Sequence, residues 1–294
     1  MKIAVYGREF QPSVIPYVQH LFDVLIARNA ELWIYEDFQQ FLGQQITFSG
    51  AFHNYSSRSQ LPEDIGFMLS LGGDGTMLAA VSIVGDSGIP VAGVNLGRLG
   101  FLADINKDDI DTAIEAIFQG EYNIQKRTLL SVWSEQTTLF KGSPFALNDI
   151  TLFKSDSSAM ITVSAYLNGE LLNAYWADGI IVATPTGSTA YSLSCGGPII
   201  VPGSGNFVIT PISPHNLNVR PVVLSDDIEL ELQIESRSGK FLLSCDSQTT
   251  SVSTDIRLKI RRAHYQANLL RLKNYSYFSN LRNKLLWGLD ARNY

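Results

Sequence analysis

The sequence predicts two domains of different class, an α/β domain followed by a largely β domain, with a C-terminal helix that packs back on the first. Three observations predict this division. Strand and helix patterns alternate from residue 1 to about 122. Apolar residues then recur at every second position over residues 123–270, as in half-buried strands. Helical spacing returns in the tail, at Leu281, Leu285 and Leu286.

The first domain opens with a strand, an amphipathic helix and a second strand. These are predicted over Lys2–Tyr6, Ser13–Arg28 and Glu31–Tyr35. Phe67–Leu71 is a continuous apolar run, which is typical of a strand buried on both faces of a parallel sheet. It leads directly into glycines and then into a helical pattern over Thr76–Val84.

The same arrangement recurs further along the chain. Pro90–Val94 reads as another buried strand that leads into the loop Asn95–Phe101, and Asp108–Phe118 predicts a further helix. Ligands of open α/β sheets bind beyond the carboxyl ends of such strands, so we expect a site where these strands end. The prediction is a Rossmann-like α/β domain over residues 1–122, joined by the C-terminal segment 271–294.

The second domain carries the period-two pattern. Asn168-Gly169 and Ser238-Gly239 are turn signals that separate its predicted strands. We expect a β-sandwich over residues 123–270. The clearest alternating segments are Ile161–Leu167, Ile228–Ile234 and Ile256–Ile260.

Composition narrows the class of protein. Hydrophobic residues make up 45% of the 294 residues and charged residues only 17%, which predicts a substantial core and suits a homo-oligomer. The net charge of −6 offers nothing to a phosphate backbone, so no nucleic-acid partner is expected. Neither a signal peptide nor a membrane-spanning run is predicted, and the two cysteines lack zinc-ligand spacing. We therefore expect a cytoplasmic protein without a membrane partner.

The turn Gly72-Gly73-Asp74-Gly75-Thr76 lies between a predicted strand and a predicted helix. Its glycines can adopt positive φ, and the freed N–H groups can converge on a phosphate. A tight turn in which Asp74 or Thr76 caps the helix is the structural alternative. The turn alone does not decide between the two.

A second glycine-containing turn, from Ala183 to Tyr191, follows the apolar strand Gly179–Val182. Its small and hydroxylated residues supply hydrogen-bond donors without bulk. A rigid loop with capping hydroxyls is the alternative here. No P-loop, H-R-D, D-F-G, G-x-G-x-x-G or G-x-S-x-G motif accompanies either turn, which counts against the common kinases, Rossmann oxidoreductases and hydrolases.

Together the two turns resemble the NAD kinase family, whose signature is G-G-D-G-T followed by D-G and T-P-T-G-S-T-A-Y. The resemblance covers essentially the whole chain, and the second block is the more selective. Further matching segments are Asn95–Leu102, Asn148-Asp149, Asp178-Gly179, Tyr191–Ser194 with Gly196-Gly197-Pro198, Pro211–His215 and Leu281–Trp287.

The resemblance implies phosphoryl transfer from ATP to the 2′-hydroxyl of the adenosine ribose of NAD, which produces NADP. Asp74 matches the proposed general base, and a carboxylate within hydrogen-bond reach can orient that hydroxyl and accept its proton. The N–H groups of Gly73 and Gly75, a Mg²⁺ ion bound through the donor phosphates and the side chain of Arg98 would align and neutralise the phosphates.

The resemblance also implies contacts to the rest of the dinucleotide. Asn148 and Asp149 match the pair that binds the adenosine ribose, with an Asx-turn as the structural alternative. Asp178 matches a residue that reaches the nicotinamide, often across a subunit boundary, and Phe101 would form a wall of the adenine pocket or simply pack in the core. The loop that binds the two heterocycles corresponds to Thr189, Ala190, Tyr191, Ser192 and Ser194.

Two positions depart from the family pattern. Trp176 stands where many members carry Arg or Lys, so a cationic contact with the dinucleotide phosphates is missing and an aromatic could stack instead. Asp246-Ser247-Gln248 stands where many have D-G-Q, which keeps Gln248 as a ligand but loses a glycine. We interpret His215 as structural.

Two other functions stay open at this point. A lipid or sphingoid-base kinase would share the G-G-D-G turn, although no amphipathic basic stretch supports a membrane surface. A dinucleotide sensor without activity would keep the fold and the binding site. The sequence also leaves open ATP against polyphosphate as donor, NAD against NADH, and dimer against tetramer.

Overall fold

The chain folds into two compact units in the computed structural model. One is formed by Met1–Gln125 with Asn268–Tyr294, and the other by Lys126–Ala267. The boundaries expected from the sequence were residues 122 and 270. No described helix is long and apolar enough to cross a membrane. The residues that the structure describes are 1–97, 100–140, 145–156 and 159–288.

The first unit is built on a parallel sheet whose strands run in the order β5-β4-β1-β2-β3. Each neighbouring pair is parallel. Beside β5 lie the short strand β6 and the end of β18, in which Leu269 pairs with Val91. The strand bounds are β1 Lys2–Gly7, β2 Glu31–Tyr35, β3 Phe52–Tyr55, β4 Phe67–Leu71, β5 Val91–Asn95 and β6 Ile105–Asn106.

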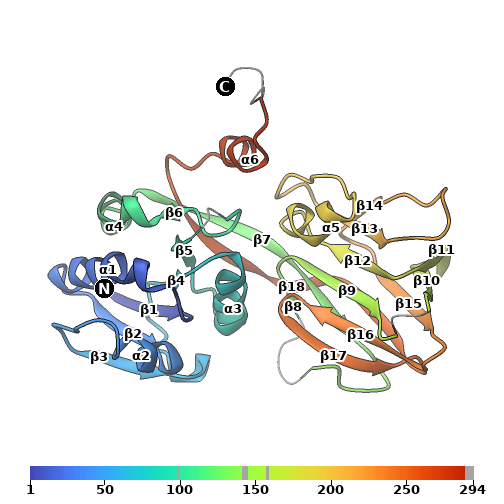
Figure 1. Cartoon of the computed structure of the whole chain (residues 1–294), viewed down its shortest axis with the longest axis horizontal. Helices are drawn as coiled ribbons and strands as arrows, with labels where there is room; N and C mark the ends of the chain where they lie inside the picture. Colours follow the sequence, from blue (N-terminus) through green and yellow to red (C-terminus); the bar gives the residue numbers. More distant parts are fainter. Residues whose placement is uncertain (98–99, 141–144, 157–158, 289–294) are drawn as a thin grey trace. The chain divides into compact units, whose positions relative to one another are not determined.

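Helices cover both faces of this sheet (Figure 1). Residues of α1, α2 and α4 share one apolar core with Val5, Leu69 and Val94. Because side chains alternate across a strand, α3 packs on the opposite face, where Gly93 faces Met77. The helix bounds are α1 Ile15–Ala27, α2 Glu36–Leu42, α3 Asp74–Val84 and α4 Ile110–Phe118, with 3₁₀ turns at Pro12–Val14, Arg58–Gln60, Gly85–Ser87 and Lys107–Asp109.

The second unit contains two antiparallel sheets. One has the strand order β14-β13-β12-β9-β16-β17, and the other includes β11-β10-β15 and the first part of β18. The bounds are β7 Tyr122–Trp133, β8 Phe145–Ala146, β9 Asp149–Lys154, β10 Ile161–Leu167, β11 Glu170–Ala177, β12 Gly179–Ala183, β13 Asn206–Ile212, β14 Val222–Ser225, β15 Leu230–Glu235, β16 Lys240–Cys245, β17 Gln248–Ser253 and β18 Arg257–Leu272, with the 3₁₀ turn Gly187–Thr189 and the short helix α5 Tyr191–Ser194.

One apolar core lies between these two sheets. It joins Ile150 and Val182 from the first sheet with Val163 and Leu232 from the second, all of them fully or almost fully buried. The expected hairpin turn at Asn168 connects β10 to β11, and Asn168 adopts a positive φ of 48° there. The predicted fold class, an α/β domain followed by a mostly β domain, is confirmed.

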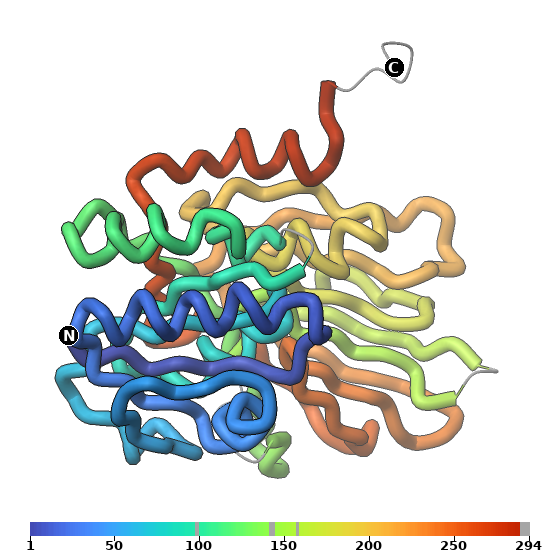
Figure 2. The backbone as a smooth tube through the Cα atoms, turned by 60° about the vertical axis from the view of Figure 1, so that its left-hand side comes forward, coloured from blue at the N-terminus to red at the C-terminus, as the bar shows by residue number. Residues whose placement is uncertain are grey.

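The C-terminal segment lies with the first unit. Figure 2 follows the chain from the end of β18 into α6 (Tyr277–Leu285), drawn in red. Ser276 caps the helix by accepting a hydrogen bond from the N–H of Ser279 at 3.3 Å. Leu281 is buried, and the ammonium of Lys284 lies over the ring of Phe101 at 5.2 Å.

Candidate functional site

The glycines of the turn between β4 and α3 have different structural roles. Gly72 has a φ of 152°, and a Cβ at this position would lie 2.4 Å from the hydroxyl of Thr76. Gly73 is the N-cap residue in an extended conformation, and no side chain caps the helix. The helix begins at Asp74, two residues before the predicted start, because the Gly73 carbonyl already accepts from the N–H groups of Thr76 and Met77.

Gly73 and Gly75 are exposed, and apart from their chain neighbours and the backbone of α3 no described atom lies within 4 Å of where their Cβ atoms would be. Neither glycine is therefore required by its described neighbours. The first N–H groups of an α-helix have no carbonyl partner within the helix and carry partial positive charge. This end of α3 thus leaves room for an anionic group to approach its backbone.

The carboxylate of Asp74 accepts three backbone hydrogen bonds from a loop 27 to 29 residues further along the chain. One oxygen accepts from Phe101 at 2.8 Å, and the other accepts from Leu102 at 3.0 Å and from Ala103 at 3.1 Å. Gly100 makes this approach possible, because a Cβ there would lie 1.8 Å from a carboxylate oxygen of Asp74. Asp74 therefore holds the loop that presents Phe101.

The same loop is held on its carbonyl side by Arg271, a buried residue at the end of β18. Its guanidinium donates to the carbonyl of Leu102 at 2.7 Å and forms an ion pair with Asp104. The loop is thus fixed through its N–H groups by Asp74 and through a carbonyl by Arg271. The backbone that carries the Phe101 side chain is therefore held from two sides.

Lys284 on α6 is a second cation near this loop, where it lies over the ring of Phe101. Burial lowers the pKa of Lys284, and the charge of Asp74 acts in the opposite direction. Within the described part of the chain, no carboxylate lies within 4.0 Å of the Lys284 ammonium. Sequence reasoning noted the segment Leu281–Trp287 without assigning a role to Lys284. The other predicted cation, Arg98, lies outside the described residues.

In the second unit the strip Leu147–Asp149 is held by Asp246. One carboxylate oxygen of Asp246 accepts from the N–H of Leu147 at 2.7 Å, and the other accepts from Asn148 at 2.9 Å and Asp149 at 3.1 Å. The N–H of Asp246 in turn donates to the carbonyl of Asp149 at 3.0 Å. The Asn148-Asp149 pair is therefore fixed by a partner almost one hundred residues away in sequence.

The opposite side of this strip is fixed by the turn after β12. The hydroxyl of Thr184 donates to the carbonyl of Leu147 at 2.5 Å, and the N–H of Thr184 donates to the carbonyl of Asn148 at 2.9 Å. At Gly187 a Cβ would lie 2.0 Å from the Asn148 carbonyl oxygen. The glycine of this motif is thus needed for close packing against the pair.

Asp149 is the first residue of β9 and is partly buried. It accepts a hydrogen bond from the hydroxyl of Thr151 at 2.9 Å. Burial raises the pKa of Asp149, and the Thr151 hydroxyl opposes this rise. Asn148 and Asp149 thus stand at the start of β9, on a backbone that Asp246 and Thr184 hold from two sides.

The hydroxylated loop after β12 divides into buried and exposed positions. Ser192 is fully buried, and its hydroxyl pairs with that of Thr210 at 2.8 Å. Thr189 donates to the carbonyl of Thr186 at 3.2 Å, and Ala190 is partly buried beside it. Tyr191 is 43% exposed, and Ser194 is exposed as well. Tyr191 and Ser194 are therefore the exposed side chains of this loop, and Thr189 and Ala190 are partly accessible.

Asp178 lies between β11 and β12, and Lys154 at the end of β9 is its ion partner. The Lys154 ammonium lies 2.6 Å from an Asp178 carboxylate oxygen, with both side chains largely buried. The N–H of Lys154 also donates to the Asp178 carbonyl at 2.9 Å. Asp178 is thus anchored by a lysine that sequence reasoning missed, since only the turn before Gly179 was noticed.

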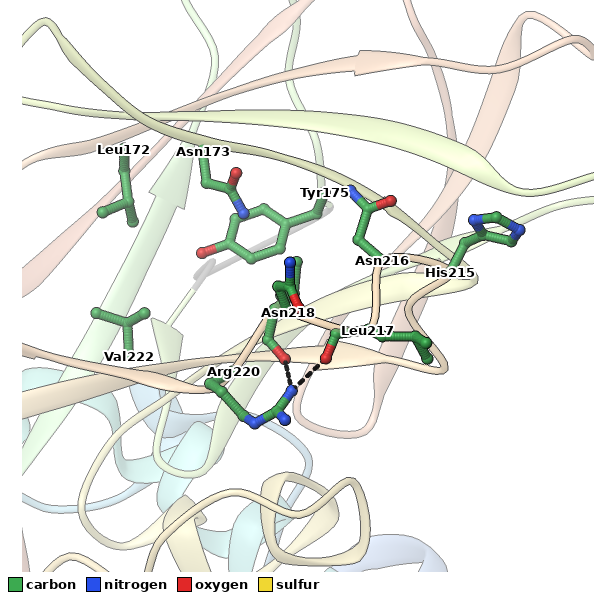
Figure 3. Close-up of a pocket in the computed structure, with 10 residues that line it drawn as sticks. Leu172, Asn173, Tyr175, His215, Asn216, Leu217, Asn218, Arg220 and Val222 are labelled. Atoms are coloured by element: carbon green, nitrogen blue, oxygen red, sulfur yellow. Dashed lines mark hydrogen bonds between the residues drawn. The ribbon is translucent and has the colours of Figure 1, made fainter.

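His215 lines a cavity of about 860 Å³ (Figure 3), and the ring of Trp176 packs against His215 at a tilt of 42°. Their ring centroids lie 4.2 Å apart. Figure 3 shows Tyr175 from β11 on one side of the cavity and the loop that carries Arg220 on the other. The guanidinium of Arg220 is bound to the carbonyls of Leu217 and Val219. Arg220 is thus a cation at this cavity whose described hydrogen bonds are to backbone carbonyls and not to a carboxylate.

Gln248 begins β17 and lies opposite Cys245, the last residue of β16. Asp246 and Ser247 form the connection between these two strands. The family pattern indicates Gln248 in this segment but not the contacts of Asp246. No residue near Asp246 in the sequence indicates that its carboxylate binds the backbone of Leu147–Asp149.

Comparisons with known proteins agree on one family. The ATP-NAD kinase N-terminal domain matches residues 7–122, and the ATP-NAD kinase C-terminal domain matches residues 147–272. A NAD kinase of Cytophaga hutchinsonii is 46% identical over 294 residues, which is 100% of both chains.

Solved structures show the same fold. The chain resembles a yeast NADH kinase complexed with NADH, with a TM-score of 0.83, 23% identity and coverage of 99% of this chain and 89% of that one. It also resembles a NAD kinase from Archaeoglobus fulgidus in complex with ATP, with a TM-score of 0.75, 25% identity and coverage of 97% and 99%. Both domain matches and the full-length relatives show that the chain belongs to the ATP-NAD kinase family of phosphotransferases.

Proposed function

We propose that this chain transfers the terminal phosphoryl group of ATP to the 2′-hydroxyl of the adenosine ribose of NAD, which yields NADP and ADP. The observation that carries the proposal is the full-length similarity to NAD kinases together with Asp74, whose carboxylate is fixed at the exposed start of α3. The ATP in the Archaeoglobus fulgidus relative supports ATP as the donor.

Asp74 is the proposed base in this reaction. The 2′-oxygen of the ribose attacks the terminal phosphorus while its proton passes to an Asp74 carboxylate oxygen, and the bond to the ADP oxygen breaks. Because the carboxylate accepts three amide hydrogen bonds, its position is set before the substrate arrives. Alignment of the hydroxyl is accordingly its main contribution, with proton acceptance following from it.

The phosphate groups of the donor require positive charge and N–H donors. Exposed Gly73 and Gly75 at the start of α3 offer backbone N–H groups, and Lys284 offers an ammonium without an ion partner in the described chain. We propose Lys284 as a donor-phosphate ligand beside the predicted Arg98. Lysine binds phosphates as a mobile point charge, which suits its place on α6.

A divalent metal, expected to be Mg²⁺, would neutralise the donor phosphates when bound. Among the described residues no cluster of three His, Cys, Asp or Glu side chains is spaced to hold a metal ion. We expect such a metal to be held through the phosphate oxygens of the donor. The protein's own part is to orient those phosphates with Gly73, Gly75 and Lys284.

The proposed contacts to the adenosine ribose and to the two heterocycles of NAD follow the family pattern. The Asp149 carboxylate would accept hydrogen bonds from the ribose hydroxyls, and the Asn148 amide could donate to them or accept from them. The backbone of both residues is fixed by Asp246. Accessible Tyr191 suits stacking on a flat heterocycle. The remaining proposed contacts are Phe101, Asp178, Thr189, Ala190, Ser194 and Gln248, whereas the buried hydroxyl of Ser192 would support the loop through Thr210.

We also propose a homo-oligomer in the cytoplasm. Leu171, Trp176 and Leu217 in the second unit are 55%, 45% and 85% exposed, and exposed apolar side chains favour association with another copy. Both cysteines are free, as is usual in a reducing compartment. Light scattering of the purified chain would show a mass above that of one copy.

A phosphorylation assay tests the proposed function. Purified chain is given ATP and Mg²⁺ with NAD, NADH or diacylglycerol in separate reactions, and products are identified by mass. We expect NADP from NAD, with polyphosphate as a second donor to be compared. Phosphorylation of the lipid without any NADP would overturn the proposal in favour of a lipid kinase.

A further inference from the structure

We propose that Asp246 is a positioning residue, whose carboxylate fixes the peptide groups of Leu147, Asn148 and Asp149 so that Asn148 and Asp149 face the ribose. The inference rests on the proposed function for the identity of the ligand. It concerns a residue outside the G-G-D-G and T-P-T-G-S-T-A-Y turns. Its evidence is geometric and lies within the second unit.

Three consecutive N–H groups converge on one side chain at 2.7, 2.9 and 3.1 Å. An ionised carboxylate has two oxygens and about four lone-pair sites, so it can satisfy all three donors at once. The backbone of Asp246 adds a fourth bond, from its own N–H to the carbonyl of Asp149. No rotation of the 147–149 peptide groups is possible without breaking several of these bonds.

Two effects disfavour an ionised aspartate at position 246, namely its backbone conformation and its burial. Asp246 adopts a left-handed φ of 49°, a conformation that glycine or asparagine would adopt with less strain. The pKa of Asp246 is raised to about 6, because burial and the charge of Asp149 outweigh the three amide hydrogen bonds, which lower it. A charged residue in such a strained, buried turn points to a function for the carboxylate itself.

Asparagine would not replace it. An asparagine side chain has one acceptor oxygen, and its amide group would turn N–H donors toward one of the three backbone N–H groups. A donor that faces a donor leaves both groups unsatisfied. We therefore expect Asp246→Asn to release part of the strip Leu147–Asp149 while the β16–β17 hairpin persists.

Protonation should act in the same direction as that substitution. The titratable groups that face Asp246 are Asp149 on β9 and Cys245 on β16. Burial raises the pKa of the Cys245 thiol, so Cys245 stays neutral across the working range. As pH falls through about 6, Asp246 gains a proton, and one oxygen changes from acceptor to donor. Affinity for NAD should then weaken.

The test compares wild type, Asp246→Asn and the control Asp255→Asn in steady-state assays from pH 5.5 to 8. Asp255 is exposed in the next turn, where it accepts from Ser253. In Asp246→Asn at pH 7.5 we expect KM for NAD to rise about 10- to 100-fold with kcat within about threefold. In wild type, KM for NAD should rise as the pH falls. In Asp246→Asn this rise should be smaller, because only the protonation of Asp149 remains to cause it.

Asp255→Asn should match wild type throughout. A KM for NAD that is unchanged in Asp246→Asn, or a loss confined to kcat, would overturn the positioning role. A merely structural role would lower the amount of folded protein without shifting the pH dependence of KM.

Amide hydrogen exchange on the wild-type chain without substrate provides a second measurement if Asp246→Asn folds poorly. After correction for intrinsic rates, the N–H groups of Leu147, Asn148 and Asp149 should lose protection between pH 7.5 and 5.5, while those of β12 keep theirs. Equal protection at both pH values would refute the role of Asp246. Because this experiment needs no activity, its failure is distinct from an absence of NADP formation, which would refute the proposed function.

Discussion

Asp74 in the first unit and Asp246 in the second hold their neighbouring loops in the same way. Each carboxylate accepts three consecutive backbone N–H groups, those of Phe101–Ala103 for Asp74 and those of Leu147–Asp149 for Asp246. The surroundings differ. Asp74 begins a helix between two exposed glycines, whereas Asp246 lies in a strand connection, where burial raises its pKa to about 6.

A carboxylate that accepts three backbone hydrogen bonds can therefore serve two purposes. Where the carboxylate also faces open space, as beside Gly73 and Gly75, it can both hold a loop and meet a substrate. Where it is turned inward, as at Asp246, it can only place other groups. We therefore expect changes at the two aspartates to alter different kinetic parameters.

The largest effect is expected for Asp74→Asn. We expect kcat to fall by about 10³- to 10⁴-fold, since the amide of asparagine cannot accept the proton of the 2′-hydroxyl. Titration calorimetry should still detect NAD binding with nearly unchanged affinity. Asp86→Asn, an exposed position in the same unit, serves as the control and should behave as wild type. Full activity in Asp74→Asn would refute the catalytic role.

Gly187→Ala should have the next largest effect. Its Cβ would lie 2.0 Å from the Asn148 carbonyl oxygen, so the strip must shift although Asp246 still holds its other side. We expect NAD affinity to fall by about tenfold or more and stability to fall by about 1–3 kcal/mol. Gly43→Ala is a matched control, because the nearest atom to its Cβ lies at 3.5 Å. Equal effects of both substitutions on NAD affinity would contradict the packing argument.

Stability and affinity should respond to pH in opposite directions. Because the folded pKa of Asp246 is raised above 3.8, the folded chain holds this proton more tightly than the unfolded chain does. Its contribution to stability is present at low pH and is lost as pH rises through about 6. Urea unfolding should show wild type gaining about 1–3 kcal/mol over Asp246→Asn between pH 7.5 and 4.5. A constant difference would show that Asp246 has no raised pKa.

Lys284→Met should have the smallest effect. We expect KM for ATP to rise about threefold to tenfold with KM for NAD unchanged, because a partly exposed ammonium is screened by water and salt. Lys284→Arg should keep most of the affinity for ATP, and Lys273→Met, an exposed lysine of the same unit, should match wild type. A KM for ATP that does not change in Lys284→Met would remove Lys284 from the donor site.

Periodicity in the sequence was sufficient to find the long or strongly apolar elements. The strands Glu31–Tyr35 and Phe67–Leu71 have the predicted bounds, and the two-domain class is confirmed. Helix α2 and strand β3 were not predicted, because segments of seven and four residues are too short to establish a period.

The candidate site could be predicted only where its residues stand in local motifs. Asp74 and Asn148-Asp149 are of this kind, although which residues hold them is not visible in the sequence. Asp246 contacts Leu147 across 99 positions of the chain, and Lys284 reaches Phe101 through the placement of α6. Contacts between residues so far apart in the sequence form only in the completed fold, so no local sequence pattern indicates them.

The most direct measurement is a side-by-side determination of kcat and of KM for NAD in Asp74→Asn and Asp246→Asn at pH 7.5. We expect Asp74→Asn to lose kcat and keep its affinity for NAD, and Asp246→Asn to keep kcat and lose affinity. If both variants lose the same parameter to the same degree, the two aspartates share one role, and the division between chemistry at Asp74 and positioning at Asp246 is wrong.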